Sequence, residues 1–447
     1  MFRKLLIANR GEIAVRIIRA CKEMGISTVA VFSEADREAL HVSLADESIC
    51  IGPAKVQDSY LNIPAVLSAA VETGAEAIHP GYGLLSENAR FAQLCEECGI
   101  AFLGPDARLI SLLGDKEQAK ATMRKAGVPV VPGCDLIKDK ETAVKEAAKI
   151  GFPLLIKARS GGGGRGIRLV RAPDEVESAY MAAYKEAESA FGDGACYMEK
   201  YLRPVKHVEV QVLCDGFGGV VCLGERECSV QRKNQKLLEE SPSPAISEET
   251  RAAMMQAAAS AARAVGYKSL GTIEFLVDKD QNFYFMEMNT RLQVEHPVTE
   301  MVTGVDLVKW QIRVGAGLPL DFEQKDVRLS GHAIECRINA EDADKDFMPS
   351  CGRIQLLHIP GGPWVRFDTA LYQDYLVPPF YDSLLGKLIV HARTREEAVR
   401  KMQAALCELV IEGVSHTAEL QMDILSHPDF TAGSYDTGFL EDMQKRN

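Results

Sequence analysis

Oxygen-bearing side chains gather where one predicted strand ends. The stretch from Phe283 to Asn289 is rich in aromatic residues and methionine, which is typical of a largely buried strand. Because residues two apart point to the same side of a strand, Glu287 and Asn289 project together. A carboxylate and an amide are hard oxygen ligands that suit Mg²⁺ better than zinc. This spacing therefore predicts a magnesium-binding face.

A third oxygen ligand lies on the preceding predicted strand, 271–277, which carries Glu274. A polar turn separates the two strands, so they can pair as an antiparallel hairpin that brings Glu274 close to Glu287. Mg²⁺ usually completes its octahedral shell with water and substrate phosphates, so the hairpin also predicts a nucleoside triphosphate. The alternative is a solvated hairpin with surface acids. Arg291 and Glu295, close downstream, favour the functional interpretation.

A glycine-rich segment, 161–166, lies between predicted strands at 153–157 and 167–170. It lacks the Lys-Ser/Thr and the helix that follow a Walker loop, so it is better interpreted as a hairpin flap. Glycines let backbone amides approach phosphate oxygens. Lys157 stands just before the loop, and Lys116 could supply a second cation. A structural turn is the alternative, but the metal-binding hairpin favours a bound nucleotide.

The elements that must position these groups begin with an alternation of strand and helix. Strands are predicted over 4–8, 27–32 and 76–79, and a helix over 12–24. This alternation predicts a parallel, doubly wound sheet, whose ligands tend to lie beyond the carboxyl ends of the strands. The loops 9–12 and 79–83 occupy such ends. The first loop lacks G-x-G-x-x-G, so a Rossmann dinucleotide site is not supported.

The rest of the chain mixes both element types. Helices are predicted over 116–126, 248–265 and 395–409, and strands over 207–213, 220–224 and 331–339. The length of 447 residues is enough for two to four domains with their own cores. We expect an N-terminal domain over 1–114, a central domain over 115–330 with a flap subdomain at about 131–203, and a C-terminal mixed α+β domain over 331–447.

Composition narrows the function classes. The formal net charge of −12 argues against a nucleic-acid or membrane-surface binder. No apolar run is long enough for a signal peptide or a transmembrane span, so neither is expected. Among 12 scattered cysteines, Cys95 and Cys98 form the one close pair, and no further zinc ligands stand at suitable spacing. We predict that both pack in the core from an amphipathic helix, in a reducing, cytoplasmic setting.

Several motifs resemble a known family. The general ones are Lys157, the glycine loop, E-K-Y-L at 199–202, Glu274 and E-M-N at 287–289, which resemble the nucleotide site of ATP-grasp enzymes. The finer ones are I-A-N-R-G-E-I-A from Ile7, H-P-G-Y-G-L-L-S-E-N from His79, H-V-E-V-Q-V from His207, E-M-N-T-R-L-Q-V-E-H-P-V-T-E from Glu287 and C-R-I-N-A-E-D from Cys336. They resemble the biotin carboxylase branch, and the similarity extends from about Lys4 to beyond Gly413.

The resemblance implies a fold and a reaction. The fold is an N-terminal biotin carboxylase domain, a central ATP-grasp domain with its flap, and a C-terminal biotin carboxylase domain. In the reaction, ATP phosphorylates bicarbonate to carboxyphosphate, which breaks down to CO₂ and phosphate. The CO₂ is then added to the ureido N1′ of biotin.

The resemblance also implies roles for individual residues. Those matching ATP contacts are Lys116, Lys157, Gly163, Gly164, Glu199, Lys200, Tyr201, Leu202, His207, Gln231, Asn234, Glu274 and Glu287. Those matching ligands of two Mg²⁺ or Mn²⁺ ions are Glu274, Glu287 and Asn289. Those matching the bicarbonate pocket are Lys236, Arg291, Glu295, Arg337 and the backbone of Val294. Glu295 matches the base that deprotonates bicarbonate, and Arg337 matches the cation that stabilises the biotin enolate, with Tyr82 near the ring.

Elementary chemistry agrees with these roles. Bicarbonate is a poor nucleophile, so a carboxylate within hydrogen-bond reach is needed to remove its proton. Lys236 and Arg291 would offset the negative charge that develops. Arginine stays protonated in almost any site, which suits Arg337 as the partner of an enolate. The alternative for Arg337 is a structural salt bridge to Glu335 or Glu341.

Two positions depart from the family pattern. Asn234 stands where many members carry histidine, and an amide keeps hydrogen-bonding ability but cannot become cationic. We hypothesise that this alters ATP affinity or its pH dependence without abolishing activity. Arg159-Ser160 also replaces a Ser-Gly pair, so the flap begins with a bulkier, charged residue.

The partners follow from what the chain does not carry. It contains no Ala/Val-Met-Lys-Met biotinylation segment, and we expect no carboxyltransferase region after Asn447. We therefore expect biotin on a separate carrier protein and carboxyltransferase subunits as further partners. The resemblance to the family also implies a homodimer. A stand-alone subunit of acetyl-CoA carboxylase, in fatty acid synthesis, is the simplest interpretation, and a two-chain pyruvate or acyl-CoA carboxylase is the alternative. The rival classes are another ATP-grasp ligase, such as a carbamoyl-phosphate synthetase-like or purine-pathway carboxylase, and a catalytically silent module.

Overall fold

The computed structural model describes residues 1–158, 167–192 and 194–446. Gly163, Gly164 and the Arg159-Ser160 pair lie outside the described residues. The chain forms two compact units. The first comprises Met1–Val128, Lys206–Phe275 and Glu287–Asn447, and the second comprises Pro129–Val205 and Leu276–Met286.

The N-terminal part of the first unit is the expected parallel sheet. Its strands are β1 (Lys4–Ile7), β2 (Ser27–Ser33), β3 (Glu47–Gly52), β4 (Ala77–His79) and β5 (Ala101–Phe102), in the order β3-β2-β1-β4-β5. Helix α1 (Gly11–Glu23) follows β1 and buries Ile13 and Ile17. The side-chain amide of Asn9 donates to the carbonyls of Pro80 and Tyr82, both at 2.8 Å. These bonds join the loops at the carboxyl ends of β1 and β4.

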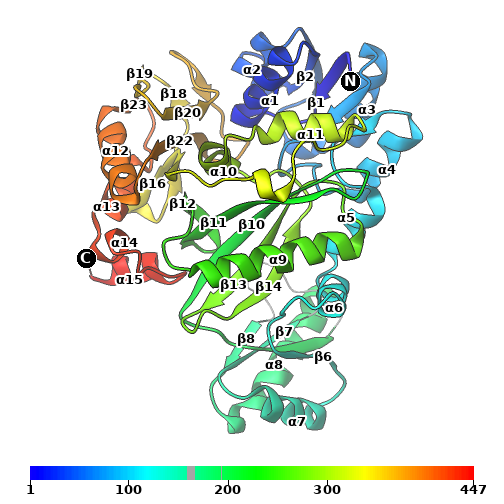
Figure 1. Cartoon of the computed structure of the whole chain (residues 1–447), viewed down its shortest axis with the longest axis vertical. Coiled ribbons are helices and arrows are strands. Elements are labelled where there is room, and N and C mark those ends of the chain that lie inside the picture. Colours follow the sequence, from blue (N-terminus) through cyan, green and yellow to red (C-terminus); the bar gives the residue numbers. More distant parts are fainter. Residues whose placement is uncertain (159–166, 193, 447) are drawn as a thin grey trace. The chain divides into compact units, whose positions relative to one another are not determined.

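A sheet of eight strands carries most of the polar groups of interest. Its order is β14 (Phe283–Asn289), β13 (Ser269–Asp278), β10 (Val205–Cys214), β11 (Val220–Arg232), β12 (Gln235–Ser241), β15 (His332–Asn339), β22 (Leu384–Ala392) and β20 (Val365–Thr369). The expected hairpin of β13 and β14 is confirmed. Figure 1 shows helix α9 (Glu248–Val265), at its predicted bounds, crossing this sheet.

Strand β11 is longer than predicted, because it continues from Gly224 to Arg232. Its second half, beyond the predicted end at Gly224, carries charged residues, and Glu225, Arg226 and Glu227 are all buried. Lys233 and Asn234 then turn the chain into β12 with φ values of +48° and +67°. A two-residue turn with both central φ positive is typical of a hairpin, and asparagine tolerates this region better than most residues.

Strand pairing in the C-terminal part brings charged residues into register. Glu239 of β12 lies opposite Glu335 of β15, and Arg337 of β15 lies opposite Lys387 of β22. Helix α12 (Arg395–Glu408) packs against β15 and β22 in a core that includes Ile334, Cys336, Leu388 and Met402. Side chains on the other side of these strands can therefore be polar.

The second unit is built on four strands, β6 (Gly133–Ile137), β7 (Leu154–Ala158), β8 (Ile167–Val170) and β9 (Cys196–Lys200), in the order β6-β9-β7-β8. Helices α7 (Lys140–Ile150) and α8 (Val176–Phe191) pack against these strands and against each other. β7 and β8 pair antiparallel, as expected for the strands that flank the glycine segment.

The remaining helices of eight or more residues in the described chain are α3 (Ile63–Thr73), α4 (Ala89–Glu97), α5 (Ala107–Gly114), α6 (Lys116–Lys125), α10 (His296–Thr303), α11 (Leu307–Gly315), α13 (Ala418–Ser426) and α15 (Phe439–Arg446). Cys95 on α4 is buried as predicted, but Cys98 is exposed because it caps the helix end instead of continuing its apolar face. Within the described residues, no helix combines the length and the apolar character needed to cross a bilayer.

Candidate active site

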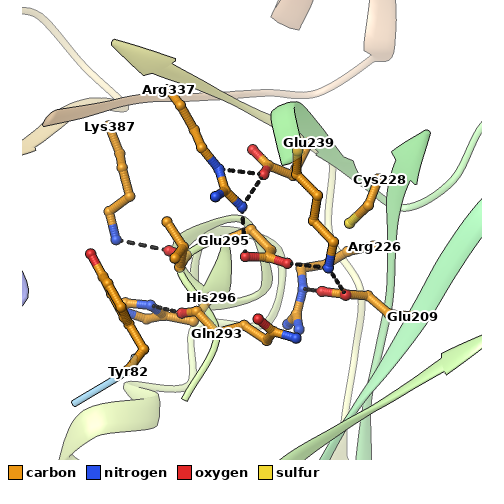
Figure 2. A network of polar contacts seen from close by, with 12 residues as sticks. Tyr82, Glu209, Arg226, Cys228, Glu239, Gln293, Glu295, His296, Arg337 and Lys387 are labelled. Atoms are coloured by element: carbon orange, nitrogen blue, oxygen red, sulfur yellow. Dashed lines mark hydrogen bonds and ion pairs between the residues drawn. The ribbon is translucent and has the colours of Figure 1, made fainter. Parts of the chain in front are cut away.

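The centre of the candidate site is the carboxylate of Glu295. This residue immediately precedes helix α10 and is fully buried. Its Oε1 accepts a hydrogen bond from Lys236 Nζ at 2.7 Å, and its Oε2 accepts one from Arg337 Nη2 at 2.9 Å. Figure 2 shows Glu295 facing Arg337 from the loop before the helix. The structure thus brings together three residues that the sequence analysis assigned to one pocket.

The charge state of Glu295 follows from these neighbours. Burial favours the neutral acid, but Lys236, Arg337 and Arg226 outweigh it and hold the pKa of Glu295 well below its ordinary value. The carboxylate is therefore ionised at neutral pH, which is the state in which it can accept a proton.

Lys236 gathers three carboxylates around one ammonium. Besides Glu295, it donates to Glu209 Oε2 at 2.6 Å and to Glu274 Oε1 at 2.9 Å. Burial disfavours the charged amine, but these three acids outweigh it and raise the pKa of Lys236 well above its ordinary value. The Lys236 ammonium therefore places a permanent positive charge between the carboxylates of Glu295 and Glu274.

Two residues at the base of this cluster were missed by the sequence analysis. Arg226 is fully buried and donates to Glu209 Oε1 at 2.5 Å, and to Gln211, Thr299 and Thr272 at 2.7–3.0 Å. The signal was present in H-V-E-V-Q-V, because strand alternation places Glu209 and Gln211 on the same side as His207. Such a fully bonded guanidinium fixes the orientation of Glu209 and thereby of Lys236.

Arg337 has other partners than the sequence suggested. The structural salt bridge considered from the sequence was to Glu335 or Glu341, but among the described residues the ion pairs of Arg337 are with Glu239 and Glu295. Nε and Nη2 of Arg337 reach Glu239 Oε1 at 2.7 and 2.5 Å. The register of β12 against β15 explains this difference, because it places Glu239 on the neighbouring strand and on the same side of the sheet as Arg337. Burial, opposed by Arg337, raises the pKa of Glu239 to about 7.

Arg291 lies beside the side-chain amides of Asn289 and Gln293. It donates to Glu87 Oε2 at 2.9 Å, to Gln293 Oε1 at 2.9 Å and to Asn289 Oδ1 at 3.1 Å. Gln293 in turn donates to Glu274 Oε1 at 3.1 Å. Arg291 is thus linked through amides to the predicted metal ligands.

Two of the three predicted metal ligands, Glu274 and Asn289, lie in direct contact. Asn289 Nδ2 donates to Glu274 Oε1 at 2.8 Å, so the amide and the carboxylate are adjacent, while Glu287 Oε2 lies 3.7 Å from Lys116 Nζ. Glu274 Oε2 lies 2.9 Å from His207 Nε2. Burial favours neutral Glu274, but Lys236 and His207 outweigh it and lower the pKa of Glu274. Two carboxylates and an amide oxygen are the donor set that Mg²⁺ prefers.

The residues that match ATP contacts divide between the two units. In the first unit, His207 Nδ1 and Gln231 Nε2 are 2.7 Å apart, and Asn234 is exposed at the tip of the β11–β12 turn. In the second unit, Lys157 Nζ lies 2.5 Å from Glu199 Oε2, and Lys200 Nζ donates to the carbonyl of Phe152 at 2.8 Å.

The next two residues of the second unit continue that set. Tyr201 donates its backbone N–H to the carbonyl of Pro153 at 3.1 Å, and Leu202 is partly buried beside it. The E-K-Y-L segment is therefore the end of β9 and the residues just beyond it.

Tyr82 belongs to a chain of buried polar contacts on the other side of Glu295. Its hydroxyl donates to Glu12 Oε1, and Lys387 Nζ lies 3.0 Å from the same oxygen. Lys387 also donates to the carbonyl of Val294 at 2.8 Å. Burial disfavours the Lys387 ammonium, but Glu12, Glu335 and Asp368 raise its pKa. Neither Glu12 nor Lys387 was predicted as a site residue from the sequence, because each is one charge on an otherwise ordinary helix or strand.

This arrangement supports anion chemistry. Lys236, Arg337 and Arg291 can hold an oxyanion, and the ionised Glu295 between two of these cations can take a proton from it. The hard oxygen ligands beside Lys236 can hold a metal with a phosphate group.

Three family models match the chain in succession. Residues 1–110 match the biotin carboxylase N-terminal domain, residues 115–323 match the ATP-binding domain of the carbamoyl-phosphate synthase L chain, and residues 335–442 match the biotin carboxylase C-terminal domain.

Whole-length relatives agree. Biotin carboxylase 1 of Bacillus subtilis is 55% identical over 443 residues, which are 99% of this chain and 98% of that protein. A crystal structure of biotin carboxylase from Campylobacter jejuni in complex with β-γ-ATP is 50% identical, with a TM-score of 0.93 and 99% of each chain covered. The biotin carboxylase domain dimer of the 2-oxoglutarate carboxylase from Hydrogenobacter thermophilus, in complex with MgADP, ADP and bicarbonate, is 51% identical, with a TM-score of 0.91, covering 99% of this chain and 98% of that one.

Proposed function

The chain belongs to the biotin carboxylase family, and on that basis we propose that it uses ATP and bicarbonate to carboxylate biotin on a separate carrier protein. The chain is a ligase of the ATP-grasp group. The observation that carries the proposal is the buried Glu295 carboxylate held between Lys236 and Arg337.

The first step is the activation of bicarbonate. Bicarbonate occupies the space among Lys236, Arg291, Arg337 and the backbone of Val294, and Glu295 accepts its proton. A carbonate oxygen then attacks the γ-phosphorus of ATP, the bond to the β-phosphate oxygen breaks, and ADP leaves. Lys236 and Arg291 stabilise the charge that develops on the transferring group, because they are fixed in place before the reaction.

The residues proposed to hold ATP are those that match the family's contacts. They are Lys116, Lys157, Glu199, Lys200, Tyr201, Leu202, His207, Gln231, Asn234, Glu274 and Glu287, with Gly163 and Gly164 outside the described residues. Glu274, Glu287 and Asn289 would hold Mg²⁺, or Mn²⁺ in its place, as two ions with ATP. The metal would neutralise phosphate oxygens and favour departure of ADP.

The second step adds CO₂ to biotin. Carboxyphosphate breaks down to CO₂ and phosphate, the proton on N1′ of biotin passes to that phosphate, and N1′ forms a bond to the CO₂ carbon. Arg337 stabilises the enolate-like ureido oxygen of biotin, since a guanidinium stays charged even when fully buried. Tyr82 lies against the ring. Biotin arrives on a carrier protein, and carboxyltransferase subunits use the carboxybiotin.

The same reaction serves several acceptors. We propose acetyl-CoA carboxylase and fatty acid synthesis as the setting, because stand-alone relatives such as the B. subtilis protein match over the whole chain. The H. thermophilus relative belongs to a 2-oxoglutarate carboxylase, and its structure is a domain dimer. That relative supports a homodimer for this chain and leaves a two-chain carboxylase of another acceptor as the second candidate. We place the reaction in the cytoplasm.

The test is steady-state ATP hydrolysis by the purified chain with Mg²⁺ and bicarbonate, with and without free biotin. Dependence on bicarbonate and stimulation by biotin are expected. Glu295→Gln, which keeps the size and loses the base, should lower bicarbonate-dependent turnover by about 10²- to 10⁴-fold. Turnover that needs bicarbonate but ignores biotin would favour another ATP-grasp ligase, and no turnover by the wild type would favour a silent module.

A further inference from the structure

Lys387 is a fully buried cation that no part of the proposed chemistry uses. It lies on β22 with 0% of its side chain exposed. Its Nζ donates to the carbonyl of Val294 at 2.8 Å and lies 3.0 Å from Glu12 Oε1. A buried ammonium is costly unless its partners are well placed, so these two contacts fix where both partners can be.

The contact with Val294 bears on the base. Val294 directly precedes Glu295, and the carbonyl of one residue and the N–H of the next share a planar peptide unit. Holding the Val294 carbonyl therefore fixes the plane from which the Glu295 side chain departs. That side chain must reach Lys236 at 2.7 Å and Arg337 at 2.9 Å, so a small rotation of the plane would break one of these contacts.

The contact with Glu12 bears on the biotin side. Glu12 lies in the first turn of α1, is almost fully buried and accepts a hydrogen bond from the hydroxyl of Tyr82. Lys387 Nζ itself lies 6.0 Å from the centre of the Tyr82 ring. The ammonium therefore holds the ring through one shared carboxylate, that of Glu12.

We infer that Lys387 is a positioning residue that orients both reactive sides of the site, Glu295 through the Val294 carbonyl and Tyr82 through Glu12. The inference rests on the proposed function, because it takes the roles of Glu295 and Tyr82 from there. A merely structural ion pair would affect stability and change the kinetics for all substrates alike.

The experiment compares substrates in one variant. Lys387→Met keeps the length of the side chain and removes the charge. We expect the KM for bicarbonate to rise about tenfold and the stimulation by free biotin to fall by a similar factor, because a misplacement of about 1 Å in a reacting group can cost up to 10²-fold. The KM for ATP should change by less than about twofold, since Lys387 contacts none of the described residues that are assigned to ATP. Lys387→Arg, which keeps the charge, should recover part of both losses.

Two further variants distinguish the effects on Glu295 and on Tyr82 from a general loss of stability. Tyr82→Phe removes the hydroxyl and keeps the ring, so it should reduce stimulation by biotin by a larger factor than it changes the KM for bicarbonate. Arg395→Met removes a cation that pairs with the fully buried Glu240 away from the site, and should lower the thermal midpoint while leaving the KM for bicarbonate as in the wild type.

The outcomes are distinguishable. An equal rise in the KM for ATP and for bicarbonate in Lys387→Met, or no change in either, would overturn the positioning role of Lys387. The proposed function would still stand as long as the wild type shows bicarbonate-dependent turnover. Absence of bicarbonate-dependent turnover in the wild type would overturn the proposed function itself. If Lys387→Met does not fold, Lys387→Arg decides by the same comparison of KM values, because it moves the donor atoms without leaving Glu12 unpaired.

Discussion

Glu239 and Glu295 form ion pairs with the same guanidinium nitrogen, Nη2 of Arg337, at 2.5 and 2.9 Å. Both carboxylates are fully buried, so one cation serves two acids that repel each other. Their pKa values move apart as a result. Burial raises that of Glu239 to about 7, whereas Lys236, Arg337 and Arg226 overcome burial at Glu295 and keep its pKa well below its ordinary value.

The raised pKa of Glu239 predicts a specific pH dependence of stability. The folded protein binds a proton at Glu239 that the unfolded chain releases above its ordinary value of 4.5. The stabilisation is therefore complete below about pH 4.5 and is lost as the pH rises through about 7, a change on the order of 3 kcal/mol. Glu239→Gln cannot titrate, so its thermal midpoint should fall less than that of the wild type between about pH 5 and pH 8. Glu396→Gln, an exposed acid on α12, should keep the wild-type slope; equal slopes in the wild type and Glu239→Gln would contradict the prediction.

Replacing Arg337 separates charge from geometry. Arg337→Lys keeps a positive charge but cannot reach Glu239 and Glu295 with a planar pair of donors. We expect the biotin-stimulated kcat to fall on the order of 10²-fold in Arg337→Lys and at least as much in Arg337→Met. Turnover numbers with free biotin and a thermal midpoint for each variant are the measurements. A wild-type kcat in the lysine variant would show that a localised charge is sufficient.

A substitution of Glu287 tests whether this residue is a ligand of the required metal ion. Removal of divalent ions with EDTA should abolish ATP hydrolysis, and Mg²⁺ should restore it. Glu287→Gln replaces a charged ligand by a neutral one, so the Mg²⁺ concentration for half-maximal turnover should rise by about tenfold. Asp280→Asn, in the exposed turn of the same hairpin, is the matched control and should keep the wild-type requirement. A Mg²⁺ requirement in Glu287→Gln equal to that of the control would remove Glu287 from the ligand set.

The unusual Asn234 is tested by restoring histidine. A protonated imidazole would attract phosphates, so Asn234→His should show a lower KM for ATP at about pH 6 than at about pH 8, whereas the wild type should vary less. Asn234→Gly controls for the backbone, because glycine accepts the φ of +67° without a polar side chain. If the KM for ATP is the same in the histidine variant and the wild type from about pH 6 to pH 8, our hypothesis about Asn234 is wrong.

Local pattern predicted much of this molecule. Alternation of strand and helix identified the parallel N-terminal sheet, and the aromatic run before Asn289 identified the hairpin that carries Glu274. Contiguous motifs likewise named Lys236, Glu295 and Arg337, which the structure brings into direct contact.

The pairing of strands far apart in the chain could not be predicted from local sequence patterns. Glu239 partners Arg337 because β12 and β15 pair in one register, and a sequence does not reveal register between strands about a hundred residues apart. The second half of β11 was not predicted as strand for a related reason. Its buried charges have partners that only the fold supplies, such as Arg251 for Glu225 and Ser243 for Glu227.

The pairing of Lys387 with Glu12 also constrains how this protein can vary over evolutionary time. Losing one member of a fully buried ion pair leaves the other uncompensated, typically at a cost of about 3–5 kcal/mol, whereas replacing both by apolar residues is often tolerated. Positions 12 and 387 should therefore change together or not at all across the lineage. A family tree would record them as a single inherited character, although one belongs to the first helix and the other to the last strand of the large sheet in chain order.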